Sequence, residues 1–436
     1  PYTASRDADA PFVFREGRVP LQYFPLGLIG HDAAAALLVD GQVVAGAAEE
    51  RFTRQKHGLN LAGRSTLPRR AIHYCLQEAG LEWGDVDLVA HYCRFTADVV
   101  ARRLEAVGAN LSPAERAGLE REHARAFSRR VSTEVVRKQV EGIAGQPIPR
   151  DRFIPVPHHG AHAAGTFYSS GFDDALCLTL DGYGEEESAR WWEADAGGLT
   201  SRSSVPLPTS LGALYQLVTA YLGFRAFGDE YKTMGLAAYG DPARHRRTSS
   251  ELVTLAADGG HSTATAWRPD LHEWLSDRLG PVPVPGGLCQ EGADIAASLQ
   301  EALERAVLHG LDHVLGDVPA DRLCLAGGVG LNARMNGAIL RSNLVKRLFV
   351  QPAAGDDGAA LGAALWAQRM AARGDGEALA GRDAHGDARG NGIRHTYWGP
   401  NGSDDEIRGA LAGHSDRLEW SRSRDVAARA ARALAA

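Results

Sequence analysis

The chain has 436 residues, of which 44% are hydrophobic and 23% charged, and its formal net charge is -7 at pH 7. This length suffices for more than one lobe, because single hydrophobic cores stop growing at about 250–300 residues. The acidic balance excludes the electrostatic footprint of a protein built to hold nucleic acid or an anionic membrane, so small molecules are the expected partners.

Export and membrane insertion are not indicated either. The sequence contains no apolar run of the ~18 residues that a transmembrane helix needs, and residues 1–6 lack a basic region followed by an apolar one. Five cysteines are scattered without CxxC spacing, which favours buried, reduced thiols. We therefore expect a cytoplasmic protein without a membrane partner.

Two similar units recur along the chain, at residues 25–48 and 175–194. Each predicts a buried strand, a small polar loop and a returning strand. In the first unit Asp40-Gly41 joins two apolar runs, which is a strong hairpin signal. Because the two units share their order of elements, they indicate an internal duplication.

Helices are predicted between and after these units. Apolar residues recur at the helical period in residues 67–81 and again in 295–314. Residues 96–140 are polar and helical, with Ser112-Pro113-Ala114-Glu115 matching a capping box, and we interpret them as an inserted helical cap.

The composition near the end of the sequence predicts a boundary between two domains. Residues 372–394 are rich in Gly, Asp, Arg and Ala, as a linker or an exposed loop would be. We therefore expect one domain over residues 1–394 and the beginning of a second domain over 395–436.

The sharpest motif is a histidine string in which His158 and His162 stand four residues apart. On a helix both imidazoles project from one face and can share a metal ion, although such a pair can also be an ordinary packed pair. Two carboxylates favour the metal. Asp181 ends an apolar strand and Asp356 precedes a small-residue helix, at positions where cations and phosphates bind in α/β folds. Capping a turn or a helix is the alternative role for each aspartate.

Glycine turns follow two of the predicted strands, at Gly182-Tyr183-Gly184 and at Gly327-Gly328-Val329-Gly330. Backbone amides in such turns can approach a phosphate or a ribose, and a following helix adds a favourable field. Glycine turns are common after strands, so each one alone is a weak signal.

His31 follows the first predicted strand, at the place that corresponds to the Asp181 loop of the second unit. A neutral imidazole there could take a proton from an attacking hydroxyl near pH 7. A packing or capping histidine is the alternative.

Taken in order, six motifs resemble the ATP-dependent O-carbamoyltransferases, which act on nodulation factors and on antibiotics such as tobramycin. They are GHDAAAALLVDGQVVAGAAEERFTRQKHG, HHGAHAAGTFY, LTLDGYGE, EYKTMGLAAYGDP, LAGGVGLN and GDDGAALGAAL. The resemblance covers nearly all of residues 26–371. It implies an α/β fold, duplicated like that of the actin, sugar-kinase and heat-shock ATPase superfamily.

The resemblance also implies the roles of individual residues. It assigns a divalent metal, iron, to His158, His162, Asp181 and Asp356, and the role of proton acceptor to His31. The metal would bind phosphate oxygens and polarise the carbamoyl carbonyl. Nucleotide contacts are expected from the glycine loops and two further side chains: Gly182, Gly184, Gly327, Gly328, Lys232 and Asn332.

The expected reaction moves a carbamoyl group from carbamoyl adenylate to a hydroxyl of a small natural product, in antibiotic or other secondary-metabolite biosynthesis. The resemblance implies that carbamoyl phosphate and ATP, with Mg²⁺, form the adenylate in a C-terminal domain. Residues 395–436 are the expected beginning of that domain, and its remainder would belong to a longer chain or to a separate subunit.

Three alternatives stay open from the sequence. A small-molecule kinase of the same superfamily has no use for His158 and His162, and a transfer-RNA modification subunit should be basic. A silent nucleotide-binding subunit has no need of His31. The sequence leaves open the acceptor, the identity of the metal and the oligomeric state, with a homodimer as one alternative.

Overall fold

The computed structural model describes residues 32–58, 67–109, 111–128, 132–226, 228–263, 271–280, 289–373 and 392–435. The chain separates into two compact units, Pro1–Trp398 and Gly399–Ala436. The described strands, in chain order, are Ala34–Val39 (β1), Gln42–Ala48 (β2), Val89–His91 (β3), Phe153–Pro155 (β4), Ala175–Leu180 (β5), Glu187–Asp195 (β6), Gly198–Pro206 (β7), Val253–Leu255 (β8), His261–Thr263 (β9), Arg322–Ala326 (β10) and Arg347–Val350 (β11).

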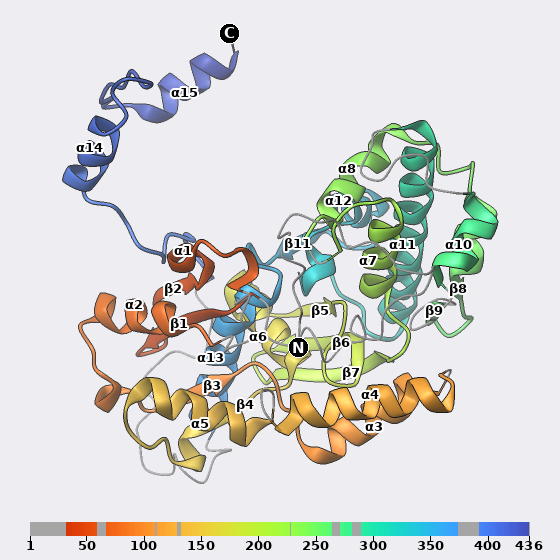
Figure 1. Ribbon diagram of the computed structural model, residues 1–436, viewed down its shortest axis with the longest axis horizontal. Coiled ribbons are helices and arrows are strands. Elements are labelled where there is room, and N and C mark those ends of the chain that lie inside the picture. The colour runs from red at the N-terminus through yellow and green to blue at the C-terminus, as the bar shows by residue number, and fades with distance from the viewer. Residues whose placement is uncertain are drawn as a thin grey trace. The chain divides into compact units, whose positions relative to one another are not determined.

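The described α-helices lie between these strands and after them (Figure 1). They are Glu50–Thr53 (α1), Arg69–Ala79 (α2), Ala97–Gly108 (α3), Pro113–Ala126 (α4), Thr133–Ala144 (α5), His158–Ser170 (α6), Leu211–Tyr221 (α7), Glu230–Leu236 (α8), Arg246–Leu252 (α9), Leu271–Leu279 (α10), Gln290–Asp317 (α11), Ala333–Ser342 (α12), Asp356–Arg373 (α13), Asp404–Ala412 (α14) and Val426–Ala435 (α15).

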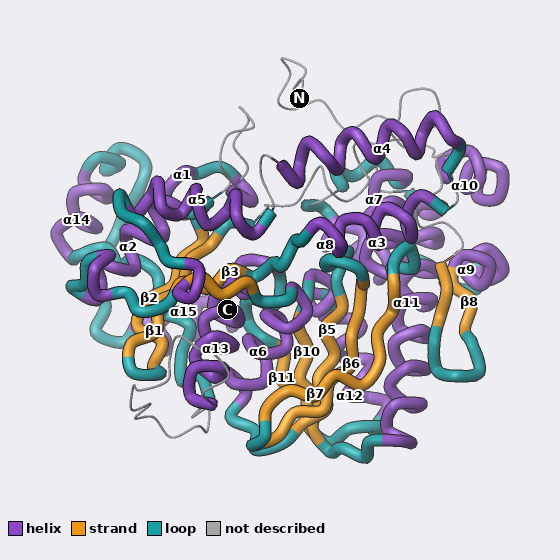
Figure 2. The backbone as a smooth tube through the Cα atoms, turned by 90° about the horizontal axis from the view of Figure 1, so that it is seen from below, coloured by secondary structure: helices purple, strands orange, loops and turns teal. Residues whose placement is uncertain are grey.

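The larger sheet has the strand order β11-β10-β5-β6-β7 (Figure 2). Its strands β5, β10 and β11 are parallel, whereas β5, β6 and β7 form an antiparallel meander. Helices cover both faces, so every residue of β5 is buried. Leu176 and Leu178 belong to the core that includes residues of α7, α11 and α12, whereas Cys177, which alternates with them, packs with Phe167 of α6.

Shorter strands in the first part of the chain repeat this order. β1 and β2 form an antiparallel hairpin, turned by Asp40 and Gly41 at φ angles of 47° and 80°, as a two-residue turn requires. β3 and β4 then pair in parallel, as β10 and β11 do after β6 and β7. Each parallel pair leads into a helix, α6 in the first part and α13 in the second. The predicted α/β fold with an internal duplication is confirmed.

The helices α6 and α13 pack directly against each other through glycine. A Cβ atom at Gly362 would lie 1.8 Å from the carbonyl oxygen of Ala161, and one at Gly165 would lie 3.3 Å from the Gly362 Cα. No side chain fits at Gly362 without moving one of the helices. Because α6 also contacts β5 and β10 while α13 contacts β1 and β3, the pair joins the two halves of the duplication.

The predicted helices are also present. Residues 67–81 contain α2, residues 295–314 lie within α11, and the polar segment 96–140 contains α3, α4 and the first part of α5. The capping box of Ser112 and Glu115 forms at the start of α4. Cys75, Cys93, Cys177 and Cys324 are buried and carry free thiols.

None of the described helices combines the length and the apolar character needed to cross a membrane. In the second unit, α14 begins with a capping box formed by Ser403 and Glu406. The division between the units, after Trp398, falls close to the boundary predicted at residue 394. The identity of the domain to which the second unit belongs stays a prediction.

Candidate metal centre

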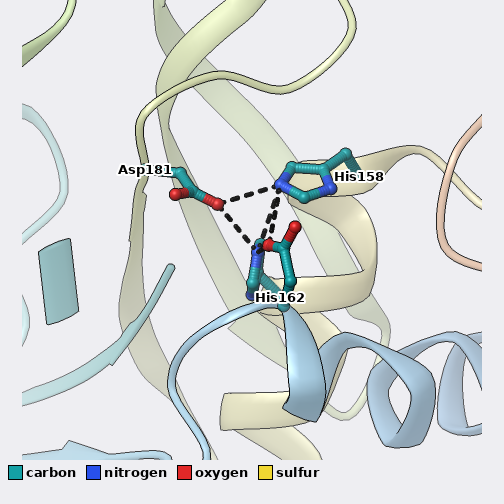
Figure 3. Close-up of side chains that lie close together, drawn as sticks. His158, His162 and Asp181 are labelled. Atoms are coloured by element: carbon teal, nitrogen blue, oxygen red, sulfur yellow. Dashed lines mark hydrogen bonds and ion pairs between the residues drawn. The ribbon is translucent and has the colours of Figure 1, made fainter. Parts of the chain in front are cut away.

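Four side chains from three elements converge at one point of the first unit. His158 and His162 lie one turn apart on α6, Asp181 follows the last residue of β5, and Asp356 is the first residue of α13. Both histidines are buried, with 3% and 2% of their surface exposed. Figure 3 shows the side chains of His158, His162 and Asp181 pointing toward one another.

The distances between the donor atoms fit a shared cation. His158 Nε2 and His162 Nε2 lie 3.2 Å apart, and Asp181 Oδ2 lies 3.0 and 3.2 Å from them. Asp356 Oδ1 lies 3.6 Å from His158 Nε2 and 3.3 Å from His162 Nε2. Adjacent donors on one divalent metal, each about 2.0–2.2 Å from it, are separated by about 3–3.5 Å. Two imidazoles and two carboxylates are also the ligand types that first-row metals such as iron bind.

Asp181 is oriented by the two glycine turns that the sequence singles out. Its Oδ1 accepts hydrogen bonds from the backbone N–H groups of Gly182, at 2.6 Å, and Gly328, at 3.2 Å. Its Oδ2 is therefore left facing the two histidines. The close approach needs glycine at Gly327, where φ is 97° and a Cβ atom would lie 2.3 Å from the carbonyl oxygen of Leu180.

Glu185 fixes the start of the histidine helix. Both of its carboxylate oxygens lie 3.0 Å from the backbone nitrogen of His158, which donates to them, and Oε1 also accepts from Arg94 N–H at 2.8 Å. A buried carboxylate at this end of a helix satisfies N–H groups that have no partner within the helix and interacts favourably with the helix dipole. Glu185 therefore positions the backbone that carries His158.

His159 anchors the same turn from the opposite side. Its Nε2 donates to the carbonyl oxygen of Glu187 at 3.2 Å, and its Nδ1 lies 2.9 Å from Thr179 Oγ1. Burial is the main reason why the pKa of His159 lies well below its ordinary value, so this imidazole is neutral. Both of its nitrogens are used by β5 and β6, which makes His159 a support of the cluster and not a member.

The electrostatics of the cluster are dominated by contacts between histidine and aspartate. Burial alone would lower the pKa of His162, but its hydrogen bonds to Asp181 and Asp356 prevail and raise the pKa to about 9. Burial would raise the pKa of Asp181, but hydrogen bonds from both histidines hold it well below its ordinary value. Asp181 is therefore ionised at neutral pH and supplies negative charge that a cation can neutralise.

The other predicted nucleotide contacts lie on nearby turns. The backbone N–H of Gly184 donates to the Glu187 carbonyl oxygen at 2.7 Å. Lys232 is exposed and forms an ion pair of 2.9 Å with Asp229.

Asn332 caps α12 by accepting from Met335 N–H at 2.9 Å, and its amide pairs reciprocally with that of Gln300 at 2.8 and 3.0 Å. The amide of Asn332 is thus occupied by protein partners. Its predicted nucleotide contact, like those of the glycines and Lys232, stays a prediction. His31 lies outside the described residues, so its predicted role also stays a prediction.

Sequence reasoning missed three residues that support the site: Glu185, His159 and Arg103. Arg103, from α3, is 1% exposed and donates to the backbone carbonyl oxygens of Gly184 and Glu185, the latter at 2.6 Å. The position of Glu185 at the end of the DGYGE string was a usable signal. Arg103 gave none, because it is one of several arginines in a polar helical segment.

The family described as "Carbamoyltransferase N-terminus" matches residues 25–365. The chain belongs to this family. The predicted resemblance to carbamoyltransferases is therefore confirmed.

Relatives of this carbamoyltransferase-family chain include nodulation protein NolNO of Sinorhizobium fredii, 35% identical over 415 residues, which are 93% of this chain and 54% of the relative. Nodulation protein NolO of Bradyrhizobium diazoefficiens is 37% identical over 283 residues, or 63% of this chain and 47% of the relative. The chain thus spans about half the length of these curated relatives. Among solved structures, component A of (R)-2-hydroxyglutaryl-CoA dehydratase from Acidaminococcus fermentans is 15% identical, with a TM-score of 0.39, and the match covers 76% of this chain and 92% of that one.

Proposed function

We propose that this chain moves a carbamoyl group from carbamoyl adenylate to a hydroxyl of a small natural product, at a centre where four side chains hold a divalent cation. The observation that carries the proposal is the convergence of His158, His162, Asp181 and Asp356 at spacings suited to one metal ion. Membership of the carbamoyltransferase family supports the choice of the group that is transferred.

His158, His162, Asp181 and Asp356 would hold the divalent cation, for which we propose Fe²⁺, and the bound cation would supply a Lewis acid for the phosphate oxygens and the carbamoyl carbonyl. The chain's own residues prepare this centre before any substrate arrives. Glu185 and His159 hold the first turn of α6, and the turns at Gly182 and Gly328 hold Asp181 with one oxygen directed inward. Such pre-organisation lowers the cost of arranging charged groups during the reaction.

The proposal can be tested by combining metal analysis with a transfer assay. Purified protein would be loaded with Fe²⁺, Mn²⁺ or Zn²⁺ and its metal content measured, beside a His158→Ala, His162→Ala double variant. Carbamoyl adenylate would be supplied directly, so that the result does not depend on its formation from carbamoyl phosphate and ATP with Mg²⁺. Carbamoylated products would be detected by mass spectrometry over a panel of small polyhydroxylated acceptors.

We expect the wild type to hold one metal ion per chain and to carbamoylate an acceptor, and the double variant to lose both properties. A His73→Ala variant is the matched control, because His73 is exposed on α2. It should keep metal and activity. A wild type that binds none of these metals, or that phosphorylates the acceptor from ATP without carbamoylating it, would contradict the proposal and favour a kinase of the same superfamily.

A further inference from the structure

A second histidine outside the metal cluster is held by a carboxylate. His57 Nδ1 donates to Asp32 Oδ1 at 2.7 Å, and the backbone N–H of Asp32 donates to the carbonyl oxygen of His57, also at 2.7 Å. The backbone N–H of His57 donates to Glu50 Oε2 at 2.7 Å. The imidazole is thus fixed in place, whereas its Nε2 is buried and has no hydrogen-bond partner among the described residues.

The backbone of this pair is strained. Asp32 has a φ of 54° and His57 a φ of 63°, which place both in the left-handed region that residues with a side chain seldom occupy. Conformations of this kind persist only where surrounding contacts enforce them, and they cluster at functional sites. The mutual hydrogen bonds of Asp32 and His57 provide those contacts.

Gly228 lies beside the unpaired nitrogen of His57. The first side-chain atom of a larger residue at Gly228 would lie 3.2 Å from His57 Nε2 and 3.7 Å from Lys56 Nζ, and apart from the chain neighbours of Gly228 no other heavy atom of the described residues would lie within 4 Å of it. Lys56 Nζ donates to the Gly228 carbonyl oxygen at 3.2 Å, so the ammonium group is held at this point. The absence of a side chain at Gly228 therefore leaves a position bordered by a proton acceptor and a cation.

The pair is connected to the metal centre through the fold. Asp32 stands two residues before β1, and β1 contacts α13, the helix whose first residue is Asp356. Asp32 and Asp356 therefore belong to neighbouring segments from different halves of the duplication.

We propose that His57 is a catalytic residue of the transfer, with Nε2 as the acceptor of the proton from the attacking hydroxyl and Asp32 as the positioning residue. This inference rests on the proposed function. Because Asp32 Oδ1 accepts a hydrogen bond from Nδ1–H of His57, it selects the tautomer whose Nε2 carries a lone pair.

In the proposed step, the hydroxyl oxygen bonds to the carbamoyl carbon while its proton moves to His57 Nε2. The bond from that carbon to the phosphate oxygen breaks, and its electron pair leaves with AMP. The proton then passes from the imidazole to water. Lys56 is placed to interact with an oxygen of the reacting groups in the space beside Gly228.

The test uses the full chain loaded with Fe²⁺ or Mn²⁺ and measures AMP release from carbamoyl adenylate, with water as the attacking hydroxyl compound. We expect His57→Ala to slow AMP release by about 10²–10⁴-fold, as loss of a general base does. Its metal content should stay at the wild-type level, and added imidazole should restore activity to this variant alone. Asp32→Asn should slow the reaction without such rescue, and Gly228→Ala should slow it by filling the space.

The inference is overturned if His57→Ala releases AMP at the wild-type rate. It is also overturned if the variant is slow and imidazole does not restore its rate at any concentration tested. It is also overturned if imidazole rescues His31→Ala but not His57→Ala, because the base would then be His31. If the metal-loaded wild type releases no AMP and carbamoylates no acceptor, the proposed carbamoyl-transfer function is itself contradicted. That outcome differs from failure of the His57 inference, in which the wild type stays active.

Discussion

The capping carboxylate Glu185 offers a sharp test of how the metal centre is built. In Glu185→Gln the side chain keeps its size but has a single acceptor oxygen in place of two. The N–H groups of His158 and Arg94 both donate to this carboxylate, at 3.0 and 2.8 Å, so one contact with the new amide nitrogen becomes repulsive or is lost. Hydrogen bonds to a charged group contribute about 1.5–3 kcal/mol, and a carboxylate at a helix start adds about 0.3–1 kcal/mol.

We therefore expect Glu185→Gln to lower the free energy of unfolding by about 2–4 kcal/mol. Metal affinity should fall by about 10–100-fold, as is usual when a group that orients a ligand is removed. Urea unfolding and competition with a chromogenic chelator measure the two effects. Glu186→Gln is the matched control, because the carboxylate of this next residue forms an exposed ion pair with Arg102. Equal metal affinities for the two variants would refute the argument.

The helix contact at Gly362, the buried His123 and the candidate metal cluster each allow a further test. Gly362→Ala should destabilise the protein by about 3 kcal/mol in urea unfolding through overlap with Ala161, whereas Gly142→Ala, in α5 with open space around it, should stabilise it by about 0.5–1 kcal/mol. Burial lowers the pKa of His123 to about 3 from its ordinary value of 6.5. At a pH below 6.5 this imidazole is therefore neutral in the folded protein and takes up a proton when the chain unfolds. Stability should accordingly fall by about 2 kcal/mol between pH 6.5 and 5, and His123→Leu should show a flatter pH profile in thermal melts. Removal of metal by a chelator should lower the melting temperature, because metal present at 100 times its Kd adds about 2.7 kcal/mol, and an unchanged melting temperature would contradict the metal site.

The fold, and the elements that carry the four clustered side chains, could be predicted from local patterns. The spacing of His158 and His162 places them on one face of a helix. Asp181 directly follows an apolar run that is typical of a buried strand, so both the helix and the strand could be predicted from the sequence. The Asp40-Gly41 turn could also be predicted, because its backbone conformation depends on only two adjacent residues.

The supporting residues could not be predicted, because their roles depend on contacts between distant segments. Arg103 reaches the 184–185 carbonyls from a helix about 80 residues earlier in the chain, as the separations of 81 and 82 residues show. The pair of Asp32 and His57 is separated by 25 residues and depends on left-handed backbone at both positions. Neither residue type nor period signals such contacts, since charged residues in helices and loops are usually solvated.

The four clustered side chains are divided between the two halves of the duplication, so binding of the proposed metal would be linked to the packing of those halves. His158 and His162 belong to the helix that ends the first half, whereas Asp181 and Asp356 belong to the second half. α6 and α13 approach each other without intervening side chains at Gly165 and Gly362, so a shift of either helix changes the distance between the histidines and Asp356. A cation bound by all four groups should therefore stabilise this packing by its binding free energy. For the same reason, a substitution that separates the helices should weaken metal binding even though it removes no ligand.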